Sequence, residues 1–172
     1  ASSYPKSEKL EEAAFLGAKS YSMLSPVYSI DQTDTSKAIE KLQTFIDTYP
    51  NSTYLEEANA VLKTLTGKIE KKNFENAKQY NTISDYKSAI IALDNFIADF
   101  PGTPYKEEAL YYKLDSAYNL AMNSVQSKMQ ERLENARLAY SGLMKFNANT
   151  TRKATADSML AEIEKNLQQF QK

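Results

Sequence analysis

The chain has 172 residues, of which 42% are hydrophobic and 25% are charged, and its formal net charge is −1. This composition is typical of a globular domain with a hydrophobic core, and a nearly neutral chain has no overall field that would attract nucleic acid. The sequence contains neither histidine nor cysteine, which excludes disulfides, thiolate metal sites and the commonest general base.

The distribution of residues along the chain predicts an all-α protein. Good helix formers are abundant, and no stretch alternates apolar and polar residues as a strand does. The first helix is expected to start at an N-cap on Ser7 and to end before Pro26, followed by an irregular loop over residues 25–34. Residues 53–82 lack proline and are interpreted as one long helix, with two helices broken at Gly67 as the alternative. Further helices are expected at about residues 34–48, 85–99, 104–123, 132–145 and 152–170, while residues 124–131 could be loop or helix.

Apolar residues recur at helical spacing in these segments, and the resulting stripes are expected to face the core. In the first helix the stripe is Ala14, Ala18, Tyr21 and Leu24. In the long helix the stripe is Ala58, Leu62, Leu65, Ile69, Ala77 and Tyr80.

An internal repeat organises the chain. Residues 38–58, AIEKLQTFIDTYPNSTYLEEA, are repeated at residues 89–109 as AIIALDNFIADFPGTPYKEEA. A shorter, more divergent copy lies at residues 136–146. The shared pattern Ala-x3-Leu-x2-Phe-x4-Pro is that of the tetratricopeptide repeat, in which a small residue lets paired helices approach and proline ends the second helix.

The repeat predicts an all-α, right-handed tetratricopeptide superhelix of about seven to eight helices. We expect one solenoid domain over residues 1–172. Its repeats are expected at about residues 8–50, 53–101 and 104–147, with a C-terminal capping helix at 152–170. The segments between repeats are longer than the fold requires, and such insertions tend to lie on one face, often the binding face.

These stretched repeats resemble the BamD family of outer-membrane assembly lipoproteins, most closely its Bacteroidetes type. The resemblance covers essentially the whole chain. The motifs that carry it are Ser25-Pro26-Val27-Tyr28-Ser29-Ile30-Asp31-Gln32, Phe45-Ile46-x-x-Tyr49-Pro50-Asn51-Ser52 and Phe74-Glu75-Asn76-Ala77-Lys78.

The resemblance implies a periplasmic accessory of the machine that inserts β-barrels into the outer membrane. Its expected partner is a BamA-type protein, bound through that protein's POTRA domains, and unfolded outer-membrane proteins are further expected ligands. The family's lipid-bearing cysteine and roughly two of its repeats would precede the part of the sequence seen here. Membrane attachment is expected only through that lipid anchor.

The candidate partner-binding residues fall into two groups. The loop residues are Pro26, Tyr28, Asp31 and Gln32, because a long loop with an aromatic side chain exceeds what a helix-to-helix turn needs. The alternative is that this loop packs back on its own repeat. The second group, for which interface and packing roles are weighed equally, comprises Tyr54, Tyr105, Tyr111 and Tyr112.

Two charged patterns have structural interpretations. The paired acids Glu11-Glu12, Glu56-Glu57 and Glu107-Glu108 recur in the first turns of predicted helices, where they stabilise helix N-termini. Lys68, Lys71, Lys72 and Lys78 are expected on a solvated helical face, with Lys71 and Glu75 as an i,i+4 pair and an acidic partner as the alternative.

The sequence thus predicts a non-enzymatic protein-binding scaffold in the cell envelope, at the periplasmic face of the outer membrane. No catalytic, cofactor-binding or metal-binding residue is predicted, since the chain also lacks a glycine-rich phosphate loop and acids at metal-ligand spacing. The alternatives are a fragment of a SusD-type glycan-uptake lipoprotein and a generic periplasmic tetratricopeptide adaptor.

Overall fold

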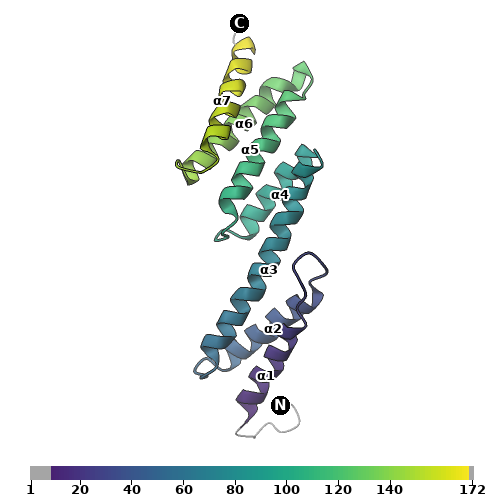
Figure 1. Cartoon of the computed structure of the whole chain (residues 1–172), viewed down its shortest axis with the longest axis vertical. Coiled ribbons are helices and arrows are strands. Elements are labelled where there is room, and N and C mark those ends of the chain that lie inside the picture. Colours follow the sequence, from purple (N-terminus) through teal and green to yellow (C-terminus); the bar gives the residue numbers. More distant parts are fainter. Residues whose placement is uncertain (1–8, 171–172) are drawn as a thin grey trace. The chain divides into compact units, whose positions relative to one another are not determined.

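The structure, a computed structural model, describes residues 9–170, and all of its regular elements in that range are helices. The all-α prediction is therefore confirmed (Figure 1). The N-cap predicted at Ser7 lies outside the described residues. The elements are α1 (Leu10–Met23), α2 (Thr33–Thr48), α3 (Leu55–Thr82), α4 (Tyr86–Asp99), α5 (Lys106–Met122), α6 (Gln126–Phe146), α7 (Lys153–Leu167) and the 3-10 helix η1 (Gln168–Phe170).

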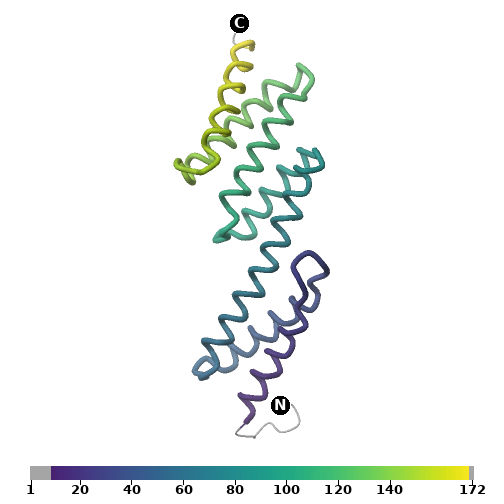
Figure 2. Tube along the Cα trace, in the orientation of Figure 1, coloured from purple at the N-terminus to yellow at the C-terminus, as the bar shows by residue number. Residues whose placement is uncertain are grey.

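Two compact units divide the chain, one up to Lys72 and one from Asn73 onward. The first contains α1, α2 and the beginning of α3, and the second contains the end of α3 and α4 to η1. The backbone trace of α3 runs without interruption past Gly67 (Figure 2), which confirms the prediction of one long helix. Residues 124–131, for which the sequence allowed either a loop or a helix, are mostly helical, because α6 begins at Gln126.

An aromatic stack forms the centre of the first unit. The Phe15 ring of α1 stacks on Tyr54, just before α3, with 4.7 Å between ring centroids and 12° between ring planes. Phe15 also lies 5.5 Å from the ring of Phe45 on α2. These contacts close a core of small and large apolar side chains, namely Phe15, Ala18, Ala38, Leu42, Phe45, Ala58 and Leu65.

The second unit repeats this stack. The Phe74 ring lies 5.2 Å from Tyr105 with 9° between planes, and 5.7 Å from Phe96. One repeat further on, the guanidinium group of Arg152 lies 4.7 Å from the centroid of the Tyr111 ring, so a cation replaces the second aromatic residue. In each of these contacts, an aromatic ring on one helix packs against a flat group on the residue that directly precedes a later helix.

Two predicted stripes differ from the buried faces. Tyr21, Leu24 and Tyr80 are 41%, 60% and 41% exposed, whereas Phe15 and Phe74 are 2% and 1% exposed. The stripe advances by three residues at a time after Ala18, and three residues turn an α-helix by only about 300°, so the predicted face drifts away from the core.

The turns that open the repeats share a hydrogen-bond pattern. The hydroxyl oxygens of Ser52, Thr103 and Thr150 accept hydrogen bonds from the backbone N–H two residues later, at 3.1, 3.3 and 3.2 Å. Ser52 also donates to the carboxylate of Glu11, and Thr150 donates to Glu107. The threonine or serine thus fixes its own turn and links it to an earlier helix.

The paired acids lie in the first turns of α1, α3 and α5, as predicted. They also make contacts between repeats that the sequence did not indicate. Glu57 pairs with Lys19 at 2.5 Å, and Glu107 accepts from the amide of Asn147 at 2.8 Å in addition to its bond from Thr150. The hydrogen bonds from Thr150 and then Asn147 hold the pKa of Glu107 below its usual value.

Replacing Phe74 by alanine is expected to lower the free energy of unfolding of the second unit by about 3–5 kcal/mol, because it empties the centre of the aromatic stack. Ile91→Ala is the matched control on α4 of the same unit, since Ile91 is 62% exposed and its truncation should change stability by less than about 0.5 kcal/mol. Urea denaturation followed by circular dichroism measures both. Equal losses in the two variants would contradict the stack's central role.

Glu107→Gln is expected to lower the melting temperature at neutral pH and to have no effect in acid. The native state holds the Glu107 pKa low, so the ionised carboxylate stabilises the fold above its usual pKa, and this contribution is lost as the pH falls through the native-state pKa. Thermal unfolding from about pH 7 to about pH 3 measures the difference between the variant and the unmodified protein. A difference independent of pH would show that the carboxylate's charge is not involved, and the exposed Glu131→Gln serves as control.

Candidate interaction surface

The loop between α1 and α2 closes around the side chain of Gln32. This residue is 7% exposed, and its amide nitrogen donates to the carbonyl oxygens of Val27 at 2.8 Å and Ile30 at 3.1 Å. Its amide oxygen accepts a 2.8 Å hydrogen bond from the hydroxyl of Thr35, which is fully buried. The buried Gln32 side chain thus satisfies its own polar atoms within the loop and gives this irregular segment a defined conformation.

Three lysines of α3 hold the same loop from another side. The Lys68 ammonium donates to the hydroxyl of Ser25 at 2.9 Å and to the carbonyl of Pro26 at 3.2 Å. Lys72 donates to the carbonyl of Ile30 at 2.5 Å, and the Lys71 ammonium lies 4.2 Å from the centroid of the Tyr28 ring.

The lysine cluster is therefore not the simple solvated face that the sequence suggested. Lys68, Lys71 and Lys72 bind the loop of their own unit. The expected pairing of Lys71 with Glu75 is replaced by an ion pair between Glu75 and Lys78 at 3.6 Å. Carbonyl oxygens and an aromatic ring attract these ammonium groups as a carboxylate would, but carry no charge that neutralises them.

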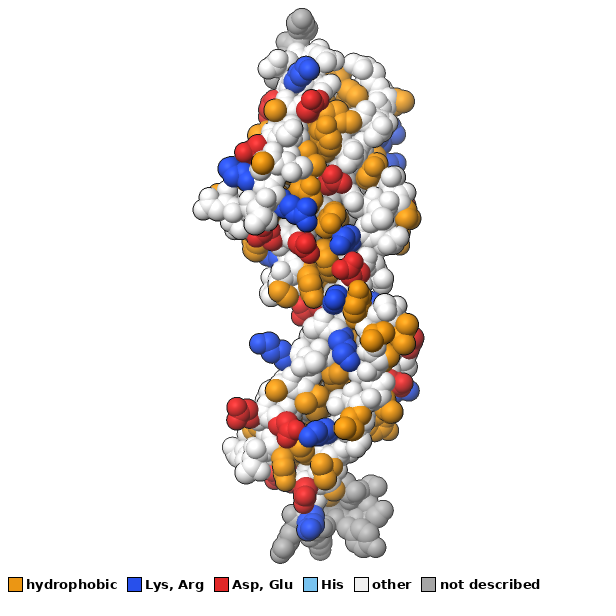
Figure 3. Space-filling view, in the orientation of Figure 1, with side chains coloured by type: hydrophobic (Ala, Val, Ile, Leu, Met, Phe, Trp, Pro, Cys, Tyr) orange, Lys and Arg blue, Asp and Glu red, His pale blue; other side chains and the backbone are white. Residues whose placement is uncertain are grey.

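The outer side of the loop is apolar. Four side chains within eight residues are exposed, namely Met23 at 80%, Leu24 at 60%, Val27 at 65% and Ile30 at 55%, and we call this set the apolar loop surface. Scattered exposed apolar residues are normal, and Figure 3 shows many of them among charged side chains. A dense group at the end of α1 and on the following hydrogen-bonded loop is less common, and this group is our candidate for an interaction site.

Asp31 lies at the edge of the apolar loop surface and is exposed. Its carboxylate accepts a 2.9 Å hydrogen bond from the backbone N–H of Thr33, at the start of α2. Hydrogen bonding by Thr33 is the main cause of a lowered pKa for Asp31, with a smaller effect from the charge of Lys72. The surface therefore carries a stable negative charge beside its apolar residues.

The structure brings the predicted loop residues together and gives them different surroundings. Gln32 is buried, Tyr28 and Pro26 are half-buried, and Asp31 faces solvent. The loop packs back on its own repeat through Gln32 and the α3 lysines, as the alternative interpretation expected, and its role in partner binding stays a prediction. The four apolar side chains were not named from the sequence, although four large apolar residues in and beside a predicted loop are a visible signal.

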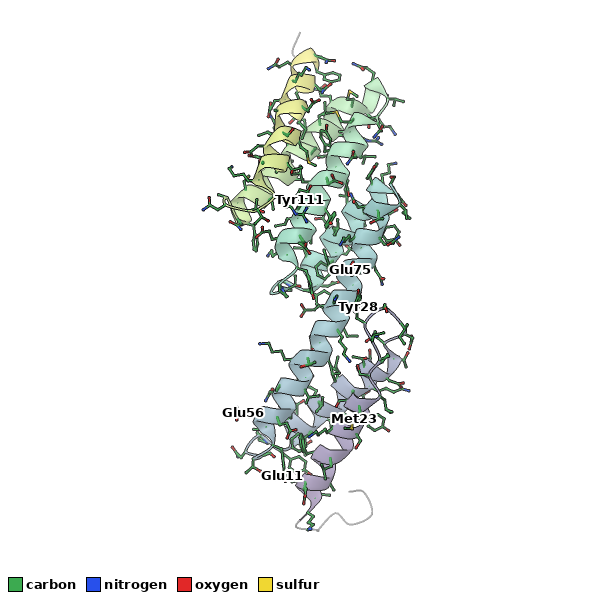
Figure 4. The ribbon with its side chains drawn as sticks, in the orientation of Figure 1. Glu11, Met23, Tyr28, Glu56, Glu75 and Tyr111 are labelled. Atoms are coloured by element: carbon green, nitrogen blue, oxygen red, sulfur yellow. The ribbon has the colours of Figure 1, made fainter. Side chains whose placement is uncertain are left out.

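The four other candidate tyrosines are packed into the repeats. Tyr54 and Tyr105 are half-buried in the aromatic stacks, and Tyr112 is half-buried 6.4 Å from Phe74. Tyr111 lies on α5 (Figure 4). It is 8% exposed, and burial is the main cause of the raised pKa of its phenol. These positions leave little ring surface for a partner, and their role in binding stays a prediction.

Within residues 9–170, no three acidic side chains cluster closely enough to hold a metal ion. None of the helices there is long and apolar enough to cross a membrane.

Comparison with known proteins gives one family match. The family model named YfiO, described as an outer membrane lipoprotein, matches residues 1–133 of the chain. No curated protein matches the chain.

Gln32→Ala is expected to loosen the loop without unfolding the helices. The substitution removes the amide donor to the carbonyls of Val27 and Ile30 and the acceptor of the buried Thr35 hydroxyl, at a cost of roughly 1–3 kcal/mol. Hydrogen exchange should therefore become faster over residues 24–35 and stay unchanged in α5 and α6. Gln43→Ala is the control, since exposed Gln43 bonds only Asp47 within its own helix, and unaltered loop exchange in Gln32→Ala would refute the assigned role.

Proposed function

Since the chain belongs to the YfiO family of outer membrane lipoproteins, we propose that it is a non-enzymatic binding scaffold of the machinery that inserts β-barrels into the outer membrane. Its partner is a BamA-type insertase, bound through the POTRA domains, and its place is the periplasmic face of the outer membrane. The family match supports the cell-envelope assignment, and the resemblance of the repeats to BamD supports the choice of partner.

The observation that carries this proposal is the apolar loop surface. Met23, Leu24, Val27 and Ile30 stay in water in the isolated chain although their loop is held in one conformation by Gln32 and by the α3 lysines. Burial of such side chains gives on the order of 1.5–3 kcal/mol each when complete. Covering this surface with a partner therefore lowers the free energy of the complex.

Preorganisation strengthens the same argument. A flexible loop loses conformational entropy on binding, at about 0.5–1.5 kcal/mol for each immobilised side chain, with further cost for the backbone. The hydrogen bonds of Gln32, Lys68 and Lys72 impose that order before any partner arrives. The loop therefore meets a folded domain, such as a POTRA domain, as a rigid surface.

Unfolded outer-membrane proteins are a second ligand of the proposed scaffold. An extended chain offers apolar side chains but also unpaired backbone groups, which favour a partner with free backbone donors or acceptors. The apolar loop surface has few of these because Gln32 and Lys72 occupy the carbonyls of Val27 and Ile30. Docking of a folded partner is thus the better match for this surface.

The double variant Val27→Glu/Ile30→Glu is expected to weaken binding to purified POTRA domains at least tenfold. Both side chains point into solvent, so the fold should be unaffected, while two carboxylates would be buried at the interface. Isothermal titration calorimetry measures the dissociation constant. Ile83→Glu is the matched control, since Ile83 is 61% exposed in the second unit. Absence of binding by the unmodified chain would overturn the choice of partner, and equal binding by both variants would overturn the choice of surface.

A further inference from the structure

An apolar groove lies within the second unit. It has a volume of about 310 Å³ and is formed where α5 packs on both α4 and α6. Figure 1 shows these three helices in the second unit. One half-buried face of α5 contributes Leu110, Lys113, Ala117 and Leu120. These residues follow one another at intervals of three, four and three, so they form one face of α5 over roughly 15 Å.

The walls of this groove are helices as well. From α4 come Ile90 and Asp94, and from α6 come Arg132, Asn135, Leu138, Ala139 and Gly142. Leu138 is 68% exposed, and a Cβ atom added at Gly142 would have no atom within 4 Å. A groove between two helices, lined by apolar side chains and with small residues such as Ala117, Ala139 and Gly142 that leave room, has the shape that accepts a third helix.

The charges around the groove select the occupant. Lys113 and Asp94 neutralise one another in an ion pair at 2.6 Å. Arg132 donates to the hydroxyl of Ser124 at 2.6 Å, but it has no carboxylate partner among residues 9–170. One uncompensated guanidinium group at the rim of an apolar groove complements a carboxylate on an apolar partner.

We propose that this groove binds an amphipathic α-helix of a partner protein, with its apolar face on α5 and a carboxylate opposite Arg132. The residues involved belong to a different unit from the apolar loop surface, and the site does not depend on the proposed docking of a POTRA domain. The scaffold would then hold two protein segments, a folded domain at its loop and a helix in its groove.

The test uses two synthetic 18-residue helices as probes with the full chain. Both carry leucine at positions i, i+3, i+4 and i+7, and they differ only in having glutamate or lysine beside that stripe. Fluorescence anisotropy should show that the acidic peptide binds at least tenfold more tightly than the basic one. Arg132→Gln should remove most of that difference.

Gly142→Leu tests the groove itself. The new side chain would fill open space, and the substitution at a helical position should not destabilise α6, since glycine is the poorer helix former. Binding of the acidic peptide should fall at least tenfold. Gly17→Leu on α1 is the matched control, because a Cβ atom there also meets nothing within 4 Å and Gly17 lies outside the groove.

Three results would overturn the proposal. They are no binding of the acidic peptide, equal binding by the two peptides, and binding that Gly142→Leu leaves unchanged. Analytical ultracentrifugation of the chain alone adds a fourth outcome, since self-association that Gly142→Leu abolishes would identify a second copy of this chain as the occupant.

Discussion

The structure depends on one packing arrangement, in which an aromatic ring of one helix is covered by a flat group just before a later helix. Phe15 with Tyr54 and Phe74 with Tyr105 are parallel ring pairs, and Tyr111 with Arg152 is the variation. Such a contact fixes both the distance and the direction of the next helix, because offset stacking tolerates little tilt. The alanines around it, all nearly fully buried, then allow close approach of the backbones.

The long helix α3 explains why the chain forms two compact units. In α5, Ala109 closes one core and Tyr111 belongs to the next, only two residues further on. In α3 the last residue of the first core is Leu65 and the first residue of the second core is Phe74, nine residues further on. The two cores therefore share a helix but no side chains, and the spacing within α3, rather than any break in the helix, separates the units.

The helices and most core positions could be predicted from the sequence, since the Ala-Leu-Phe pattern states which face of each second helix is buried. The buried faces of α1 and of the end of α3 were harder to predict, because the residue that marks each of them is a phenylalanine and not the repeated alanine. The segments Phe15-Leu-Gly-Ala18-Lys19 and Phe74-Glu-Asn-Ala77-Lys78 share Phe-x-x-Ala-Lys, and this repetition was the available signal. The conformation of the loop between α1 and α2 could not be predicted, since Lys68 contacts Ser25 from 43 residues away and no periodicity links them.

The way in which the loop is fixed also restricts what can bind it. Its carbonyl groups at Pro26, Val27 and Ile30 accept hydrogen bonds from Lys68, Gln32 and Lys72, all from within the unit. A partner that relied on main-chain hydrogen bonds, as in the addition of a β-strand, would have to displace donors that are already well placed. What the loop offers outward is apolar side chains beside the charge of Asp31. Under the proposed function, recognition there would consequently rest on the shape and apolar character of a folded surface, with one polar contact to set its orientation.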